Sequence, residues 1–274
     1  MPLFPAEVAR LEEPRGVADL THAADISEPI LGGVMARSAP GVWTNHALGL
    51  CMDQPADGRS LDHLVGFYAD HAIEPRVEVC PMADESLLKG LASRGFVLKG
   101  FESVLARALE SGDNISALVP PPGGLSFDPI DPADDAALRE YCGLIYRAFF
   151  PAEHPGPSDA DMGAMLRFIR RPGTIAVRAI IEGRFIGGGS VTVSGPVASL
   201  AGAAVIEPFR RRGVQQHLLA HRLRLASRAG ARIATIGSKP GVATERNVLR
   251  MGFTMAYTRA ILVRPGEGLV GEPG

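Results

Sequence analysis

The chain has 274 residues, of which 46% are hydrophobic, enough for one or two domains with cores of their own. Its 28 basic and 30 acidic residues give a net charge of −2, so the chain as a whole has no electrostatic attraction for nucleic acid or anionic lipid. No apolar stretch approaches the roughly 20 residues needed to cross a bilayer, and residues 1–7 lack the basic and apolar regions of a secretory signal, so we expect a cytoplasmic protein.

The three cysteines are widely spaced along the chain, at Cys51, Cys80 and Cys142. This spacing suits neither a disulfide framework nor a zinc site. We expect each to be a small buried hydrophobic residue, and we expect no metal.

The N-terminal half contains two predicted strands around a connection with little positive charge. A strand is predicted over Val42–Leu50, and Asp53–Arg59 follows it with two aspartates that would repel a phosphate group. A second strand over Arg76–Cys80 and a helix over Asp84–Arg94 come next. His46, on the first strand, is either a structural histidine or a substrate contact, and its lack of a visible partner favours the structural role.

The C-terminal half follows a turn-rich segment, Pro120–Gly124. Its hydrophobic pattern predicts two helices, three consecutive strands, and then helix, strand, helix and strand. In chain order these are Asp131–Phe150, Asp159–Ile169, Thr174–Ile181, Phe185–Val193, Val197–Ile206, Gln216–Ala229, Arg232–Ile236, Ala243–Met251 and Tyr257–Val263.

A basic loop with the sequence Arg-Arg-Arg-Gly-Val-Gln occupies residues 210–215, between the third of these strands and the next helix. A strand that turns at a glycine into a helix presents unpaired backbone N–H groups and the positive end of the helix dipole at one point. The arginines add charge-assisted contacts, and Gly213 allows close approach of the backbone. The loop therefore predicts a pyrophosphate site, although three adjacent arginines alone are also typical of a solvated surface turn.

The spacing of this loop differs from the two common phosphate motifs. The chain has no G-x-x-x-x-G-K-[ST] sequence, and its glycine run 187–189 lies inside a strand hairpin. The loop resembles the acyl-CoA loop of the GNAT superfamily of N-acetyltransferases, Q/R-x-x-G-x-G/A. Arg210 and Gly213 take the first two positions, and Gln215 stands where the family usually has Gly or Ala. The order of elements from about Leu125 to Pro265 is also that of a GNAT domain.

The two halves of the chain repeat the same order of elements. Gly95-Phe96 aligns with Gly252-Phe253, and a short strand and a helix precede each pair. The resemblance therefore implies an α/β (α+β) fold of two GNAT-like domains, each a mixed, mostly antiparallel twisted sheet flanked by helices. We expect residues 1–119 to be a degenerate domain without a coenzyme loop and residues 120–274 to be the catalytic domain.

The resemblance implies that acetyl-CoA is the cosubstrate and that an amine attacks it directly in a ternary complex. A backbone N–H before the loop would bind the developing oxyanion, and this stabilisation together with proximity accounts for much of the rate in such enzymes. The residues implied in coenzyme binding are Ala204, Val205, Ile206, Arg211, Arg212, Gly213, Val214, Gln215, Gln216 and Asn247.

The catalytic side chains are less well defined by the pattern. Val248 stands where the family usually has the tyrosine that protonates the leaving thiolate, so water or Tyr257 would have to replace it. Tyr257 is alternatively a packing residue. Glu207 is the candidate general base, and it is equally open to solvation or to pairing with the arginines. Asn247 is either a coenzyme contact or a helix-surface residue.

The acceptor would approach the connection Phe149–Pro155, where Glu153 and His154 could meet a cationic amine. Small molecules and peptides both remain possible acceptors, because a fold gives a class of chemistry and not a substrate. A homodimer is possible. Two alternatives stay open: an acyl-CoA-binding sensor or pseudoenzyme, and a nucleic-acid or protein contact by the basic loop, which the balanced charge disfavours.

Overall fold

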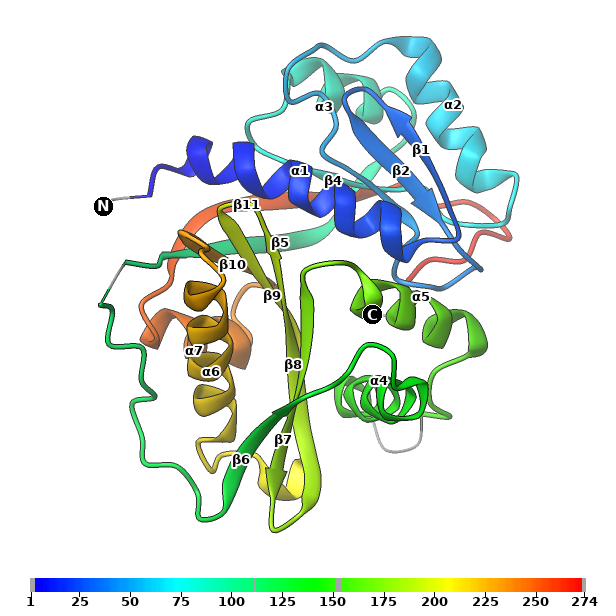
Figure 1. The fold of residues 1–274 in the computed structure, drawn as a ribbon. Helices are drawn as coiled ribbons and strands as arrows, with labels where there is room; N and C mark the ends of the chain where they lie inside the picture. Colours follow the sequence, from blue (N-terminus) through cyan, green and yellow to red (C-terminus); the bar gives the residue numbers. More distant parts are fainter. Residues whose placement is uncertain (1–2, 111, 151–153, 273–274) are drawn as a thin grey trace. The chain divides into compact units, whose positions relative to one another are not determined.

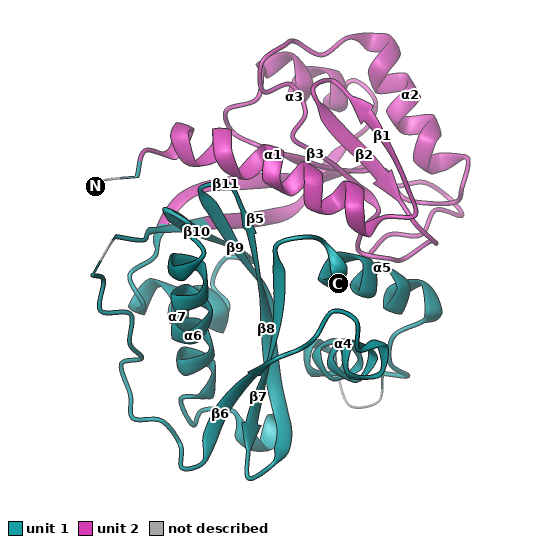
Figure 2. Cartoon of the chain, viewed as in Figure 1, with its two compact units in different colours: residues 1–3, 105–254 teal, residues 4–104, 255–274 magenta. Residues whose placement is uncertain are grey.

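The computed structural model describes residues 3–110, 112–150 and 154–272, and these divide into two compact units (Figures 1 and 2). Unit 1 is built mainly from Leu105–Thr254. Unit 2 contains Phe4–Val104 and the C-terminal segment that begins at Met255. These units divide the chain differently from the boundary after residue 119, so the assignment of residues 1–119 and 120–274 as domains stays a prediction.

Unit 1 is a sheet with the strand order β10-β9-β8-β7-β6 and the end of β5 beside β10. The pair β9 and β10 is parallel, and the other pairs from β9 to β6 are antiparallel. α6 and α7 cover one face of the sheet and α4 and α5 the other (Figure 1). The elements are β6 (Leu125–Pro129), α4 (Asp135–Phe149), α5 (Asp159–Arg170), β7 (Thr174–Ile181), β8 (Arg184–Ser194), β9 (Val197–Val205), the short 3₁₀ helix η1 (Glu207–Phe209), α6 (Val214–Arg228), β10 (Ile233–Ser238) and α7 (Ala243–Arg250).

Unit 2 has the strand order β1-β2-β3-β4-β11, and its pair β3 and β4 is parallel. β11 comes from the C-terminal half of the sequence and pairs antiparallel with β4. The sequence from β3 through α2 to β4 thus has the same strand, helix, parallel strand order as β9, α6 and β10 in unit 1. The elements are α1 (Pro5–Ala23), β1 (Ile26–Ile30), β2 (Gly33–Arg37), β3 (His46–Leu48), α2 (Gly58–Ala69), β4 (Arg76–Val79), α3 (Glu85–Ala92), β5 (Val97–Ala108) and β11 (Thr254–Val263).

The predicted fold class, a mixed α and β fold with mostly antiparallel sheets flanked by helices, is confirmed. All nine elements predicted for the C-terminal half are present, with ends that differ by up to four residues. The three cysteines are buried and free, as expected. No helix among the described residues is long and apolar enough to span a membrane.

One predicted strand is much shorter than expected. Of Val42–Leu50 only His46–Leu48 is a strand. The preceding residues form turns because their side chains bond to nearby groups: Asn45 Oδ1 accepts from Ser38 N, and Thr44 Oγ1 donates to Ser38 Oγ. Such local side-chain bonds compete with a sheet ladder, and apolar alternation alone does not reveal them.

Candidate coenzyme site

Two parallel strands of unit 1 diverge next to the basic loop. β9 and β10 are paired only from Val197 to Ser199, while β9 continues to Val205. Its register with β8 shifts after Gly188, which faces Ala204, and such a bulge bends a strand. The far part of β9 therefore has no β10 partner along its edge.

Val205 presents its backbone to that free edge. Ile206 N donates to Ile186 O in the ladder with β8. Because amides in an antiparallel ladder alternate in direction, the N–H and C=O of Val205 point away from β8. Arg210 Nε donates to Val205 O at 2.9 Å, which agrees with this direction. Among Ala204, Val205 and Ile206, the three residues predicted for the site on this strand, Val205 is the one whose N–H points toward the free edge and can donate to a ligand.

The loop between β9 and α6 contains two left-handed residues. Arg211 has φ 60° and Gly213 has φ 82°, and Gly213 is the N-cap of α6 without any side-chain cap. Left-handed residues among right-handed ones turn successive N–H groups inward and form an anion-binding concavity. A Cβ on Gly213 would lie 2.8 Å from Val119 Cγ2. Both the positive φ and the close packing therefore favour glycine at this position.

The three arginines of the loop have different environments. Arg210 is structural, since it donates to Val205 O and to Ala148 O at 3.0 Å. Arg211 and Arg212 are exposed, and neither forms an ion pair with any described residue. The Arg212 guanidinium carbon lies 5.2 Å from the centre of the Phe209 ring. Two free guanidinium groups thus remain beside the uncapped start of α6.

Gln215 and Asn247, predicted on separate helices, are hydrogen-bonded to each other. Asn247 Nδ2 donates to Gln215 Oε1 at 3.0 Å and so links α7 to α6. Gln216 Oε1 accepts from Leu118 N at 3.2 Å, and His217 Nε2 lies 2.9 Å from Val119 O. The segment before β6 is therefore bound to the first turn of α6. The sequence did not show this contact, because it joins residues about 98 positions apart.

Comparisons with known proteins agree with this geometry. The family model of the acetyltransferase (GNAT) family matches residues 139–253. These residues form a GNAT acetyltransferase domain.

The fold of the whole chain is also similar to solved GNAT structures. A GCN5-related N-acetyltransferase from Kribbella flavida has 20% sequence identity and a TM-score of 0.67, with 96% of this chain and 97% of that chain covered. A tandem GNAT protein from the clavulanic acid biosynthesis pathway has 14% identity and a TM-score of 0.60, with 96% and 87% covered. Among curated proteins the search found no match. At these identities the likeness concerns the fold.

Glu207, the candidate base of the GNAT domain, is exposed at the start of η1. Its carboxylate forms no ion pair with a described residue, so the pairing with the neighbouring arginines that the sequence left open is not observed. Its backbone oxygen accepts from Arg210 N at 3.1 Å. The carboxylate is thus open to solvent, and its catalytic role stays a prediction.

Tyr257, the candidate acid, lies in unit 2 on β11 and is buried. Its hydroxyl donates to Glu13 Oε1 at 2.6 Å, and burial raises the pKa of the phenol. This is the environment of a packing residue. Val248 is 2% exposed in the core beneath α7, so no proton donor occupies that position.

A buried group of charged side chains occupies unit 2. Arg259 Nε donates to Glu13 Oε1 at 2.9 Å, and its Nη1 lies 3.2 Å from Glu102 and 3.8 Å from Glu78. Burial, and then the negative charge of Glu78, raise the pKa of Glu102 to about 7. Burial lowers the pKa of His46 to about 4, so this histidine is neutral at pH 7 and has the structural environment favoured above.

The acceptor-side connection of the GNAT domain carries a group of aromatic rings. The Phe150 and His154 rings stack with centres 4.4 Å apart, and the Tyr146 ring lies 4.5 Å from that of Phe150. Tyr146 OH donates to Asp161 Oδ2 at 3.4 Å. Glu153, the other residue predicted to face an amine, lies outside the described residues.

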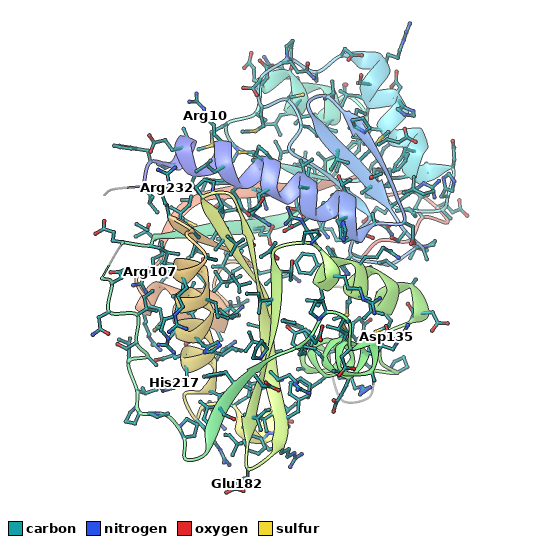
Figure 3. All side chains as sticks on the ribbon, in the orientation of Figure 1. Arg10, Arg107, Asp135, Glu182, His217 and Arg232 are labelled. Carbon is teal, nitrogen blue, oxygen red and sulfur yellow. The ribbon has the colours of Figure 1, made fainter. Side chains whose placement is uncertain are left out.

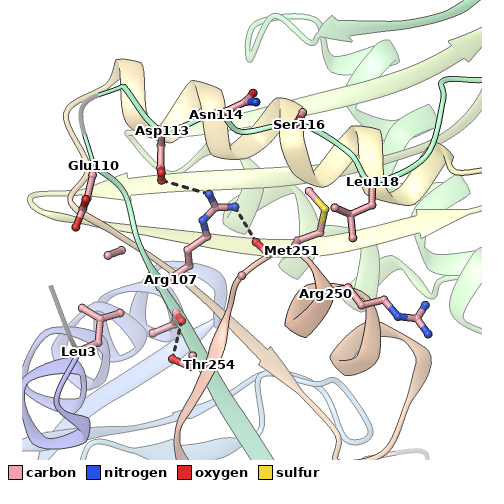
Figure 4. A pocket seen from close by; sticks show the side chains of 13 residues that line it. Leu3, Arg107, Glu110, Asp113, Asn114, Ser116, Leu118, Arg250, Met251 and Thr254 are labelled. Carbon is pink, nitrogen blue, oxygen red and sulfur yellow. Dashed lines mark hydrogen bonds and ion pairs between the residues drawn. The ribbon is translucent and has the colours of Figure 1, made fainter.

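Unit 1 also has a polar pocket of about 520 Å³, with residues 106–110 and 113–118 on one side and the end of α7 on the other (Figure 4). Arg107 Nη1 donates to Met251 O at 2.7 Å, and its Nη2 bonds the Asp113 carboxylate at 3.2 Å. Arg107 therefore ties the end of β5 to α7. The pocket lies at the end of α7. The predicted coenzyme residues other than Asn247 lie in the loop before α6, at the start of α6 and at the free edge of β9.

Proposed function

We propose that the GNAT domain transfers the acetyl group of acetyl-CoA to an amine acceptor by direct attack in a ternary complex. The observation that carries the proposal is the uncapped start of α6, with left-handed Arg211 and Gly213, beside the free edge of β9. N–H groups and the helix dipole at such a start favour a diphosphate. Arg211 and Arg212, which form no ion pair with a described residue, add positive charge.

The free edge of β9 supports the second part of the proposal. Acetyl-CoA supplies an acetyl group activated as a thioester. The Val205 N–H, directed away from β8, is placed to donate to the thioester oxygen as negative charge develops there. Ala204 and Ile206 hold this strand in its ladder with β8, since Ala204 faces Gly188 and Ile206 N donates to Ile186 O.

Proton transfer is assigned to Glu207, which would remove a proton from the amine directly or through water. Glu207 is exposed and without an ion-pair partner among the described residues, so it is free to act in this way. For Tyr257 to act as the acid, its hydroxyl would first have to leave Glu13. Tyr257→Phe tests that role: unchanged kcat would exclude it.

A second candidate function is an acyl-CoA-binding sensor or pseudoenzyme. It is favoured by Val248, which lies in the core where the family usually places its proton donor. Binding of acetyl-CoA without turnover is expected from this candidate. Turnover of any amine in a broad panel of small-molecule and peptide acceptors would exclude it.

The test of the coenzyme site is a thermal-shift titration with acetyl-CoA, with free coenzyme A and ATP as comparison ligands. A ligand that binds only the folded state at a hundred times its Kd stabilises it by roughly 2.7 kcal/mol, a readily measured shift. We expect a saturable shift with acetyl-CoA and little with ATP. The absence of any shift at millimolar acetyl-CoA would overturn both candidate functions.

Release of free thiol from acetyl-CoA in the presence of amines then separates transferase from sensor. The panel should contain small amines and peptides, because both classes fit the proposal. The cytoplasmic location expected from the sequence stays a prediction, and the sequence left a homodimer open. Fractionation would test the location, and sedimentation would test the oligomeric state.

A further inference from the structure

A fourth arginine, which the sequence did not single out, lies beside the basic loop. The Arg184 guanidinium carbon is 5.5 Å from the centre of the Phe209 ring, and that of Arg212 is 5.2 Å from the same centre. Phe209 in turn packs on a small core that contains Val205 and Val214. Two guanidinium groups therefore share one anchored ring.

The hairpin of β7 and β8 explains why Arg184 is at this position. Ile181 pairs with Arg184 across the turn Glu182-Gly183, whose residues have φ 52° and 76°. β8 pairs with β9 so that Gly187 faces Val205. The tip of the hairpin, where Figure 3 labels Glu182, thus lies at the end of β9 that leads into the basic loop.

Neither Arg184 nor Arg212 has an acidic partner among the residues that the structure describes. Arg184 is exposed and, like Arg212, forms no ion pair with a described residue. Segments 182–184 and 207–212 together contain four arginines and two glutamates, Glu182 and Glu207, in a chain of net charge −2. Contact with an aromatic face restricts a guanidinium group, so less freedom is lost when it binds an anion.

We propose that Arg184, together with Arg212, binds the phosphate group on the ribose of coenzyme A, and that this contact makes the protein prefer coenzyme A to its dephospho form. The inference rests on the proposed function. The uncapped start of α6 accounts for the diphosphate, and coenzyme A carries one further phosphate. A phosphate monoester has a charge of about −1.5 to −2 at pH 7, and the planar guanidinium fork matches its oxygens.

The test compares the Kd of acetyl-CoA with that of 3′-dephospho-acetyl-CoA, measured by calorimetry at one fixed salt concentration. We expect the wild-type protein to bind acetyl-CoA about tenfold more tightly or better. Arg184→Ala should weaken acetyl-CoA binding about tenfold, which corresponds to about 1.4 kcal/mol, and leave the dephospho ligand unchanged. Arg184→Lys keeps the positive charge but loses the planar guanidinium group. Its affinity for acetyl-CoA should lie between those of the wild-type protein and Arg184→Ala.

The matched control is Arg228→Ala, because Arg228 is exposed at the opposite end of α6. It should leave both affinities unchanged. Two results would overturn this inference: equal affinities of the wild-type protein for the two ligands, or an equal loss of affinity for both ligands in Arg184→Ala. In either case the protein still binds acetyl-CoA, so the proposed function would stand. A wild-type protein that binds neither ligand would overturn both. An unchanged melting temperature without ligand confirms that each variant is folded.

Discussion

The starts of α6 in unit 1 and α2 in unit 2 occupy the same place in the repeated order of elements, yet they differ in chemistry. α6 begins after Gly213, which has a left-handed backbone and provides no side-chain cap. α2 begins after Asp57, whose carboxylate accepts from Ser60 N at 2.9 Å and from Ser60 Oγ at 2.7 Å. Hydrogen bonds from Ser60 lower the pKa of Asp57.

The Asp57 carboxylate is itself an anion at the start of α2, and it accepts hydrogen bonds from N–H groups that a bound phosphate would need. The two helix starts differ in the N-cap residue and in its backbone conformation, and the loops before them differ in charge. We infer that these differences together decide whether such a helix start is available to a ligand. The parallel strands beside the two helix starts also differ, in the size and charge of their side chains. Unit 2 places His46 and Glu78 on its parallel pair, whereas the free edge of β9 carries Gly202, Ala203 and Ala204.

The largest effect is expected from reversing the charge at the α6 start. Arg212→Glu should weaken acetyl-CoA binding by about a hundredfold or more, because a carboxylate would face the phosphates in place of a guanidinium group. Calorimetric titration measures the loss, and Arg228→Glu is the control for the change in net charge. Since Arg212 is exposed, the melting temperature without ligand should not change. Equal affinity in variant and wild type would remove the anion-site argument.

The second prediction separates backbone strain from packing at Gly213. Gly213→Ala and Gly230→Ala place a side chain at nearly the same φ, 82° and 85°, but only the first Cβ meets another atom, Val119 Cγ2 at 2.8 Å. We expect Gly213→Ala to lower the free energy of unfolding by about 2 kcal/mol and Gly230→Ala by about 1 kcal/mol. Denaturant unfolding measures both. Equal losses would show that Val119 moves aside without cost.

The third prediction concerns pH and the buried charges of unit 2. The pKa of Glu102 is raised from 4.5 to about 7, so the folded state binds more protons than the unfolded state between these values and stability falls as pH rises through this window. Glu102→Gln removes this fall. The variant should match the wild type near pH 4 and exceed it by on the order of 1 kcal/mol at pH 8. A constant difference across the pH range would contradict the assignment.

The smallest effect is expected at the α2 start. Asp57→Ala removes the N-cap, so the melting temperature should fall by about 2 to 4 °C. The stoichiometry of acetyl-CoA binding should stay the same, because the start of α2 has a single arginine, Arg59, and its N-cap backbone is extended where that of α6 is left-handed. Scanning calorimetry and titration test the two parts. A second bound coenzyme in this variant would show that Asp57 alone closes the site in unit 2.

Much of the candidate site followed from local sequence. The strand, the basic loop and the helix around Gly213 are encoded within about 30 consecutive residues, and the structure forms all three. Other features required residues far apart in the chain. Arg184 and Arg212 contact the same Phe209 ring, and Gln215 bonds Asn247 on another helix. Nothing in the spacing of these residues shows such contacts.

The sequence by itself determined the order of elements, the resemblance of the C-terminal half to the GNAT family and the absence of the R-x-x-G spacing before α2, because each depends on neighbours along the chain. Only the tertiary structure decided which strand completes each sheet. β4 pairs with β11, from the other end of the chain, and not with β5, which follows α3. The two strands have 12 and 10 residues, and each contains an apolar run, Val104–Ala106 in β5 and Ala260–Val263 in β11, so their local pattern fits either position. The choice depends on packing between distant segments, which also buries Tyr257 against Glu13 and leaves Val205 at a free edge.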